Sequence, residues 1–177
     1  MQPWPCFINQ LRTIPYMDAM HAEWLRQYAE EADRILEWGC GGSTIWLAQI
    51  AKGKLFSVEH DPEWRQKVDS VVVHLESVIP LATWIIDLRT EREEYCGKGR
   101  RFLPRDFDLA FIDGYAPWRL DCLEACKKCV KPGGHIFMHD SQRYTSELFK
   151  FIGSNCKRSE TRVDSIGVGM WHGQLKE

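Results

Sequence analysis

The sequence predicts one α/β domain spanning residues 1–177, in which a mostly parallel sheet is covered by helices on both faces. Two patterns support this fold class. Strand-like segments alternate five times with segments of helical periodicity between residues 34 and 152, and strands joined through helices run parallel. Two final strands, near 157–163 and 166–172, are joined by a short polar turn, which predicts an antiparallel edge of the sheet.

The segment before the first strand predicts an arm followed by a helix. Residues 1–16 contain three prolines and no clear periodicity, which is typical of an arm lying over a domain. Residues 17–31 carry an apolar stripe that includes Met20, Trp24 and Tyr28, which predicts an amphipathic helix. We expect residues 1–32 to cover a cleft in a core formed by residues 33–177.

Five strand–helix units make up most of this core. We expect strands at 34–38, 54–59, 82–88, 107–114 and 135–140, and helices at 44–52, 61–77, within 90–105, at 117–130 and at 142–152. Val71–Val73 also fits a strand, but the apolar residues from Trp64 to Leu75 share one helix face, and Pro80 then interrupts the pattern, which favours a helix. Residues 131–134, Lys-Pro-Gly-Gly, predict a turn before the fifth strand.

Composition narrows the class of protein. The net charge is −2, so no bulk attraction to nucleic acid or to an anionic membrane is expected. No apolar run approaches the roughly 18 residues that a membrane-spanning helix needs. The N-terminus lacks the basic and apolar segments of a signal peptide, and the seven cysteines are an odd number, so we expect a cytoplasmic protein without a disulfide framework.

A glycine-rich segment after the first strand is the first candidate site. Gly39-Cys40-Gly41-Gly42 follows a short apolar run, and Ser43 begins a helical pattern. Glycines allow close approach of a ligand to the backbone, and a helix N-terminus offers free N–H groups, which together favour a nucleotide-like cofactor. Thr44 stands where a dinucleotide-binding fingerprint has its third glycine, and a tight turn without a ligand also fits the pattern.

An acidic residue at the end of the second strand is the second candidate. Glu59 lies 20 residues after Gly39, and a carboxylate at this position can accept hydrogen bonds from both hydroxyls of a ribose. A solvated strand end is the alternative interpretation. Together with the glycine loop, Glu59 favours ribose binding.

At this point four motifs, in order over residues 33–142, carry a resemblance to a known family. They are Glu37-Trp38-Gly39-Cys40-Gly41-Gly42-Ser43-Thr44, Ser57-Val58-Glu59-His60-Asp61-Pro62-Glu63-Trp64, Phe107-Asp108-Leu109-Ala110-Phe111-Ile112-Asp113-Gly114 and Lys131-Pro132-Gly133-Gly134. The set resembles the class I S-adenosylmethionine-dependent methyltransferases, in their small O-methyltransferase-like branch. The resemblance implies a Rossmann-like, doubly wound, three-layer fold with a seven-stranded sheet and the cofactor at the carboxyl edge of the first strands.

The resemblance also implies which residues hold S-adenosylmethionine. The methionine part and the ribose would lie against the loop formed by Gly39, Cys40, Gly41, Ser43 and Thr44. Glu37 would hold the amino end of the cofactor, and Glu59 would bind the ribose hydroxyls. His60 and Asp87 would border the adenine, and Asp113 and Gly114 would complete the site.

Two acids at strand ends are candidates for the chemistry. Asp113 follows the fourth strand and Asp140 the fifth, so both are expected in one crevice, where they suit a Mg²⁺ or Mn²⁺ ion or proton transfer. Metal-dependent O-methyltransferases resemble this arrangement, but Ser141 stands where they carry a further acid or amide. A metal-free site would use His139 or Asp140 as the general base, and a purely structural role for Asp113 and Asp140 remains an alternative.

Several other residues have two interpretations. Arg119 and Arg143 are each placed to bind an anionic substrate group or to pair with Asp121 or Asp140. Three cysteines on one helix face, Cys122, Cys126 and Cys129, favour core packing over a zinc site because no second ligand pair accompanies them. The basic residues Lys98, Arg100, Arg101 and Arg105 favour a solvated loop.

The function that these observations favour is transfer of a methyl group from S-adenosylmethionine to an oxygen of a small molecule, with Asp113, His139, Asp140 and Arg143 in the catalytic site beside Tyr144. A divalent metal at Asp113 and Asp140 is one version of this site. We expect a small-molecule acceptor and no nucleic acid or membrane partner, and a homodimer is compatible with the sequence. The alternatives are a non-catalytic S-adenosylmethionine- or nucleotide-binding domain and a nicotinamide-dependent oxidoreductase.

Overall fold

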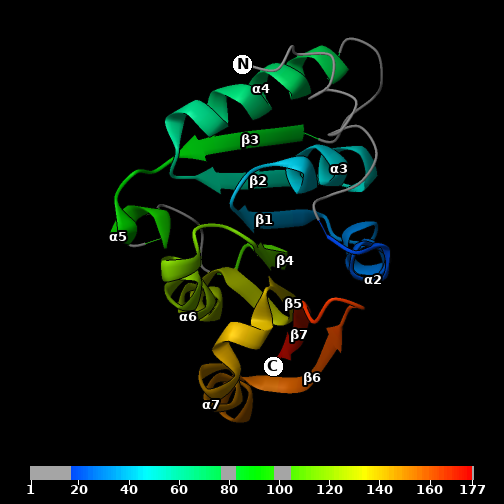
Figure 1. The fold of residues 1–177 in the computed structure, drawn as a ribbon, viewed down its shortest axis with the longest axis vertical. Helices are drawn as coiled ribbons and strands as arrows, with labels where there is room; N and C mark the ends of the chain where they lie inside the picture. Colours follow the sequence, from blue (N-terminus) through cyan, green and yellow to red (C-terminus); the bar gives the residue numbers. More distant parts are fainter. Residues whose placement is uncertain (1–16, 77–82, 98–104, 177) are drawn as a thin grey trace.

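The computed structural model describes residues 17–76, 83–97 and 105–176, and these form a seven-stranded sheet in the order β3-β2-β1-β4-β5-β7-β6 (Figure 1). The strands are β1 (Arg34–Trp38), β2 (Lys54–Glu59), β3 (Thr83–Leu88), β4 (Phe107–Ile112), β5 (Val130–His139), β6 (Cys156–Val163) and β7 (Gly169–Leu175). The first five are parallel, and β7 pairs antiparallel with both β5 and β6. The predicted fold class, with its antiparallel C-terminal edge, is confirmed.

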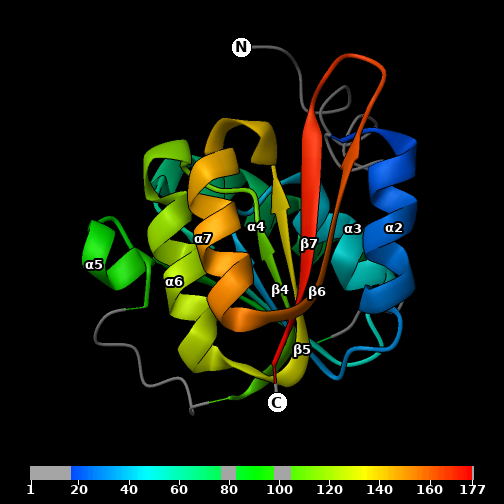
Figure 2. The same ribbon diagram turned by 90° about the horizontal axis from the view of Figure 1, so that it is seen from below.

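Helices cover both faces of the sheet. They are α2 (Ala19–Ala29), α3 (Gly42–Ile50), α4 (Pro62–Glu76), α5 (Arg92–Tyr95), α6 (Arg119–Cys129) and α7 (Thr145–Asn155), with the 3₁₀ turns η1 (Ala116–Trp118) and η2 (Ser141–Tyr144). Figure 2 shows α5, α6 and α7 on one side of the sheet and α2 and α3 on the other. This is the three-layer arrangement that alternation of strands and helices predicts.

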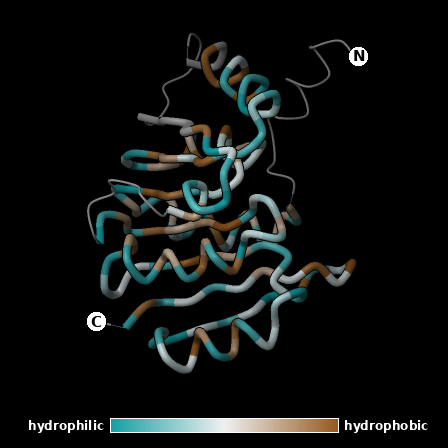
Figure 3. The backbone as a smooth tube through the Cα atoms, turned by 90° about the vertical axis from the view of Figure 1, so that its left-hand side faces the viewer, coloured by the Kyte–Doolittle hydropathy of each residue, from teal (hydrophilic) through white to brown (hydrophobic). Residues whose placement is uncertain are grey.

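Alternate residues of the central strand enter two different hydrophobic cores. Leu36 and Trp38 of β1 pack into the core beneath α6 and α7, whereas Ile35 packs into the core beneath α2 and α3. Alternation of this kind follows from the period of two residues in a strand. Figure 3 shows the hydrophobic residues running along the strands, with hydrophilic residues at many of the turns. A central parallel strand is thus buried on both faces.

The segment after β2 is a helix, as predicted. The side chain of Asp61 caps α4, because its Oδ1 atom accepts the backbone N–H groups of Glu63 (2.9 Å) and Trp64 (3.0 Å). Pro62 occupies the first helical position, where a missing N–H costs nothing. The alternative strand at 71–73 is therefore excluded, and β3 follows at 83–88.

The turn predicted at residues 131–134 was wrong, because these residues lie within β5. Val130 already pairs with Phe107, and the register shifts before His135 pairs with Leu109. Gly133 has φ +74°, a conformation that favours glycine. The glycines therefore form an irregularity inside the strand rather than a turn before it.

The sixth strand lies where it was predicted, at Cys156–Val163, but the last strand is displaced. β7 begins at Gly169, three residues after the predicted start, because the turn occupies residues 164–168. Asp164 Oδ1 accepts the N–H groups of Ile166 (3.0 Å) and Val168 (2.8 Å), which holds the longer loop.

The helix α2 packs on the face of the sheet formed by β5 and β7. Its Trp24 ring lies edge-on to Phe137, with ring centroids 5.3 Å apart, and Tyr28 packs against His135 and His172. The arm expected at residues 1–16 lies outside the described residues. Within the described ranges, every helix is too short or too polar to cross a bilayer.

Candidate functional site

The glycine loop after β1 makes a close backbone contact with the loop after β4. Gly39 has φ +92°, and its N–H donates to the carbonyl of Val58 on β2 (2.8 Å). A Cβ atom at Gly39 would lie 2.3 Å from the Cα atom of Gly114, and a Cβ atom at Gly114 would lie 3.0 Å from the backbone nitrogen of Gly39. Glycine is required at both positions, because the loop after β4 fills the space of a side chain at Gly39 and the Tyr95 hydroxyl, 1.9 Å from the added Cβ atom, fills that of a side chain at Gly114.

Glu59 at the end of β2 holds this loop in place. Its carboxylate is almost fully buried and accepts the backbone N–H groups of Cys40 (2.9 Å), His60 (2.7 Å) and Asp61 (2.9 Å). The Nδ1 atom of His60 lies 2.6 Å from the same carboxylate. Three backbone donors fix the orientation of the Glu59 side chain without a ligand.

A cavity of about 300 Å³ opens between the loops that follow β1, β2 and β4. Its walls are formed by residues 39–43, residues 59–61, Trp64 and residues 113–115. The strand order reverses between β1 and β4, which is where ligands of doubly wound sheets bind. Most of the residues predicted to bind a cofactor therefore converge at one place, among them Gly39, Cys40, Gly41, Ser43, Glu59, His60, Asp113 and Gly114.

Glu37 and Thr44 lie behind the glycine loop rather than in the cavity wall. Glu37 is fully buried, and its carboxylate accepts hydrogen bonds from Ser43 Oγ (2.6 Å), Thr44 Oγ1 (2.7 Å) and Ser57 Oγ. Burial raises the pKa of Glu37 to about 7, although the three hydroxyl donors oppose this shift. The structure places Glu37 as a support that ties the start of α3 to β1 and β2.

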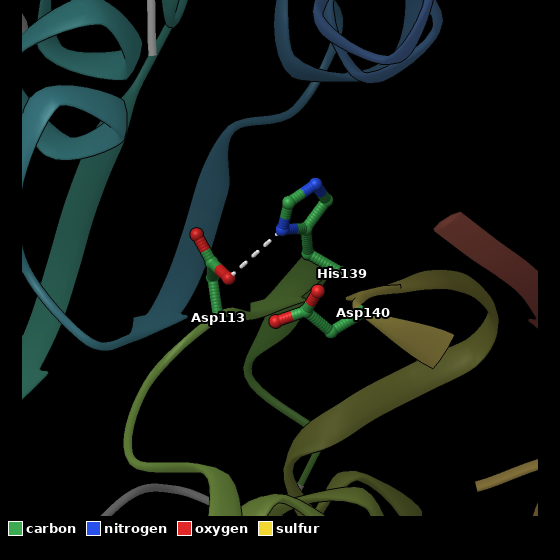
Figure 4. A group of neighbouring side chains, drawn as sticks. All are labelled: Asp113, His139 and Asp140. Carbon is green, nitrogen blue, oxygen red and sulfur yellow. Dashed lines mark hydrogen bonds and ion pairs between the residues drawn. The ribbon is translucent and has the colours of Figure 1, made fainter. Parts of the chain in front are cut away.

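A second cluster lies at the ends of β4 and β5. Ile112 and Met138 are in register, so Asp113 and His139 follow side by side. His139 Nδ1 lies 3.2 Å from Asp113 Oδ1, and Asp140 is next in the chain (Figure 4). With Nδ1 donating to the carboxylate, Nε2 carries a free lone pair. Nε2 is buried, points away from both carboxylates, and has no hydrogen-bond partner within the described ranges.

Arg119, the first residue of α6, bridges the two carboxylates of this cluster. Its Nη2 atom donates to Asp113 Oδ1 (3.2 Å) and its Nη1 atom to Asp140 Oδ2 (3.0 Å). The guanidinium also donates to the carbonyls of Gly114 (2.9 Å), His139 (2.8 Å) and Asp113 (3.1 Å). The sequence left Arg119 between anion binding and pairing with Asp121 or Asp140. The structure shows the pairing with Asp140, while Asp121 pairs with Arg92.

The charges of this cluster shift its pKa values. Burial alone would lower the pKa of His139, but the hydrogen bond and charge of Asp113, with the charge of Asp140, raise it above its ordinary value. Burial alone would raise the pKa of Asp140, but the charges of Arg119 and His139 and the Arg119 hydrogen bond lower it. Asp140 therefore remains ionised at neutral pH.

The same three side chains could in principle hold a metal ion. Asp113, His139 and Asp140 each offer a ligand atom, and these atoms lie within 4.8 Å of one another. The carboxylates, however, already pair with the buried guanidinium of Arg119, which keeps its positive charge at any ordinary pH. A divalent cation there would have to displace or oppose this cation, so the residues present do not fit a metal.

Other predicted site residues lie outside this cluster or outside the description. Arg143 is exposed in η2, and its N–H donates to the Asp140 carbonyl (3.2 Å), while Tyr144 donates to the Ala116 carbonyl (2.7 Å). Asp87 is in register with Val58, but its side chain lies outside the described part of the structure. The basic loop residues Lys98, Arg100 and Arg101 also lie outside the described residues.

Some cavity residues were not found by sequence reasoning. Trp64 donates from Nε1 to the Cys40 carbonyl (2.6 Å) and thereby fixes the glycine loop from α4. Tyr115 lies at the rim, with its ring 4.9 Å from that of His60. Their positions could have indicated both, since Trp64 is the last residue of the second motif and Tyr115 directly follows the third.

The cysteines predicted to pack in the core do so. Cys122, Cys126 and Cys129 are buried side chains of α6 within the hydrophobic core. Burial raises the pKa of Cys126, which is typical of an inert thiol.

The fold and cavity define a class: a Rossmann-like domain with a glycine loop and a strand-end acid at the point where the strand order reverses. A family model described as a methyltransferase domain matches residues 36–141. The chain therefore belongs to this methyltransferase family, which confirms the predicted membership of the class I S-adenosylmethionine-dependent methyltransferase superfamily. Among curated proteins, none matches the chain in sequence.

Solved structures share the fold at low sequence identity. The O-methyltransferase TomG of Streptomyces achromogenes, involved in tomaymycin synthesis and solved with S-adenosylmethionine, is 18% identical, with a TM-score of 0.71 over 96% of this chain and 86% of its own. An O-methyltransferase of Bacillus cereus, solved with S-adenosylhomocysteine, is 18% identical, with a TM-score of 0.71 over 99% of this chain and 93% of its own.

A third protein of the same fold is an N-methyltransferase. The N-methyltransferase NodS of Bradyrhizobium japonicum WM9, solved with S-adenosylhomocysteine, is 16% identical, with a TM-score of 0.61 over 99% of this chain and 92% of its own. The fold therefore does not decide which atom of an acceptor is methylated.

Proposed function

We propose that this protein transfers a methyl group from S-adenosylmethionine to a hydroxyl oxygen of a small molecule, with His139 as the general base. The observation that carries this proposal is the buried Nε2 atom of His139, whose ring is oriented by Asp113. Asp113 also lines the cavity that we assign to the cofactor, so one side chain contacts both the base and this cavity.

The residues around the cavity fit an adenosyl cofactor. Gly39, Gly41 and Gly114 line the cavity, and the Glu59 carboxyl group is an acceptor already fixed by three N–H groups. We assign the ribose to Glu59 and the adenine to the face of His60, which packs against Tyr115. When bound, S-adenosylmethionine supplies an electrophilic methyl group.

His139 removes the proton that the acceptor loses. Its Nδ1–H donates to Asp113, which fixes the tautomer and leaves the Nε2 lone pair for the acceptor O–H. Asp113 then stabilises the imidazolium that forms, and the net raised pKa of His139 is consistent with this arrangement. His139 is therefore proposed as a base that is positioned before the acceptor binds.

A second histidine favours an acceptor with more than one donor group. His21 of α2 is fully buried, and its ring lies edge-on to His139 at 5.8 Å between centroids. Its Nε2 atom lies 3.0 Å from the Arg162 carbonyl and donates to it, so Nδ1 carries a lone pair without a donor among the described residues. Two such lone pairs favour a polyol or a phenol with adjacent hydroxyls.

Cofactor binding comes first in the test. We expect S-adenosylhomocysteine to raise the melting temperature and to bind in calorimetry, whereas NAD and NADP do neither. Stabilisation by NAD alone would overturn the proposal in favour of an oxidoreductase.

Methyl transfer is then measured with methyl-labelled S-adenosylmethionine and a panel of catechols, simple phenols, polyols and primary amines, with products identified by mass spectrometry. We expect label in the hydroxylated acceptors. Tight S-adenosylhomocysteine binding with no label in any acceptor would support a non-catalytic binding domain. Label found only in the amines would refute the assignment to oxygen.

A further inference from the structure

We propose that Arg119 takes the place of a divalent cation in this site, so that methyl transfer, if it occurs as proposed above, is metal-independent and Arg119 is a positioning residue. The inference rests on the guanidinium that bridges Asp113 and Asp140. It concerns the same three side chains, Asp113, His139 and Asp140, whose ligand atoms lie within 4.8 Å of one another.

The guanidinium uses its full set of donors. An arginine side chain has five N–H bonds, and five hydrogen bonds connect Arg119 to acceptors at distances of 2.8–3.2 Å. The acceptors are the two carboxylates and three backbone carbonyls of the loops that follow β4 and β5. A side chain bound in this way is fixed in one orientation, and only 7% of its surface is exposed.

A metal would have to remove this cation. A divalent ion at the carboxylates would lie next to a guanidinium that cannot lose its proton. Moving Arg119 away would break its hydrogen bonds to three carbonyls, of which the bond to the His139 carbonyl is buried, and the loss of a buried hydrogen bond is costly. The arrangement is therefore built around one permanent positive charge, which neutralises part of the charge of Asp113 and Asp140.

The consequence for the base is geometric. Asp113 Oδ1 accepts from Arg119 Nη2 and lies 3.2 Å from His139 Nδ1, so the arginine holds the oxygen that orients the imidazole. Arg119 also holds the His139 carbonyl and the side chain of Asp140, whose backbone is left-handed at φ 55°. Arg119 thus fixes Asp113 and the end of β5 together, without contacting the acceptor itself.

The first test uses the unaltered protein and needs no cofactor. Mn²⁺ is titrated into the protein while the EPR signal of free Mn²⁺ is recorded, and we expect the same signal with and without protein. Methyl transfer is measured in parallel with EDTA and with added Mg²⁺, and we expect equal rates. Binding of one Mn²⁺ that Asp140→Asn abolishes, or loss of activity in EDTA that Mg²⁺ restores, would overturn the inference.

The second test replaces the cation. Arg119→Met keeps an unbranched apolar stem without charge, and we expect it to gain Mn²⁺ binding, which the second substitution Asp140→Asn removes. We expect kcat to fall about 10- to 100-fold, as for other residues that orient a catalytic group, with the cofactor KM unchanged. Arg119→Lys should recover part of kcat, because lysine restores the positive charge but not the planar set of five donors. A folded Arg119→Met variant with full kcat would contradict the inference.

A matched control removes an arginine–aspartate pair elsewhere. Arg92→Met breaks the exposed pair with Asp121 and should change neither Mn²⁺ binding nor kcat. If no acceptor is methylated under any condition while the Mn²⁺ results are as expected, the proposed function fails and the inference about Arg119 stands. If methyl transfer is found but depends on a metal, only the inference fails.

Discussion

The acidic side chains at the two halves of the sheet's carboxyl edge are held by different kinds of partner. At β1 and β2, the carboxylate of Glu59 accepts backbone N–H groups from its own loop and from the neighbouring glycine loop. At β4 and β5, the carboxylates of Asp113 and Asp140 share a side-chain cation, Arg119, which begins a helix packed beneath them. Glu59 is thus held by uncharged backbone groups, whereas Asp113 and Asp140 are held by a full positive charge.

This difference matches the tasks that we assign to each half. Backbone N–H groups hold the Glu59 carboxyl group in place beside the cavity, where it can accept the hydroxyls of a ribose. A fixed cation next to Asp113 instead limits the negative charge around His139, and it holds the carboxylate in one orientation. One edge of a sheet can therefore hold a cofactor and position a base without a metal at either place.

Replacing the base should have the largest effect and should be confined to the second half. For His139→Gln we expect kcat to fall by about 10²- to 10⁴-fold, because general-base catalysis contributes this much. Affinity for S-adenosylhomocysteine, measured by calorimetry, should stay within about twofold, since His139 is not in the cavity wall. His135→Gln, four residues earlier on β5, serves as the control. Equal losses of kcat in both variants would argue against His139 as the base.

Adding a methyl group at Gly39 should destabilise the cofactor half of the sheet edge. Gly39→Ala places a Cβ atom 2.3 Å from the backbone of Gly114 at φ +92°, so we expect the free energy of unfolding to fall by about 2–4 kcal/mol in urea titrations. Gly153→Ala is the matched control, because nothing lies within 4 Å of its added Cβ atom inside α7. There we expect a gain of about 0.5–1 kcal/mol. Equal stabilities of the two variants would disprove the requirement for glycine.

Removing the charge of Glu59 should weaken cofactor binding without abolishing the fold. Glu59→Gln loses one charged acceptor and turns an amide towards a backbone N–H, so we expect the dissociation constant of S-adenosylhomocysteine to rise about 10- to 100-fold. Glu63→Gln, exposed in the first turn of α4, should leave it unchanged. Calorimetry on both variants decides this, and an unchanged affinity for Glu59→Gln would remove Glu59 from the ribose site.

Glu37 should give the smallest effect, a dependence of stability on pH. Its pKa of about 7 in the folded protein lies above the ordinary value of 4.5, so between pH 5 and pH 7 the folded state holds a proton that the unfolded chain has lost. The free energy of unfolding should therefore decrease as pH rises, by about 2 kcal/mol over this interval from this group. In Glu37→Gln that decrease should be absent, and parallel pH curves for the two proteins would contradict the assignment.

Much of the cofactor half could be predicted from the sequence because its determinants are local. The glycine loop, Glu59 and the capping acid Asp61 all lie within about two dozen residues, and their spacing alone indicates strand, loop and helix start. The exception is Glu37. Its motif suggested contact with the cofactor, whereas packing against Ser57 of β2 buries it behind the loop.

The second half was predicted only as a set of residues at strand ends. The sequence indicated that Asp113, His139 and Asp140 would share one crevice, because parallel strands end at the same edge. It could not show that Arg119 would join them, because Asp121, only two residues away in the chain, was also available as a partner for Arg119. The pairing depends on where α6 lies over β4 and β5.

The sequence by itself determined the order of strands and helices, the glycine loop and the acid that follows β2, because hydrophobic periodicity and backbone requirements act over short stretches of chain. The tertiary structure decided which cation pairs with Asp113 and Asp140, that Glu37 is buried behind the glycine loop, and which nitrogen of His139 has no partner among the described residues. These depend on strand register and helix placement between residues as much as 26 positions apart, as for Asp113 and His139. Contacts of this kind exist only once the sheet has formed.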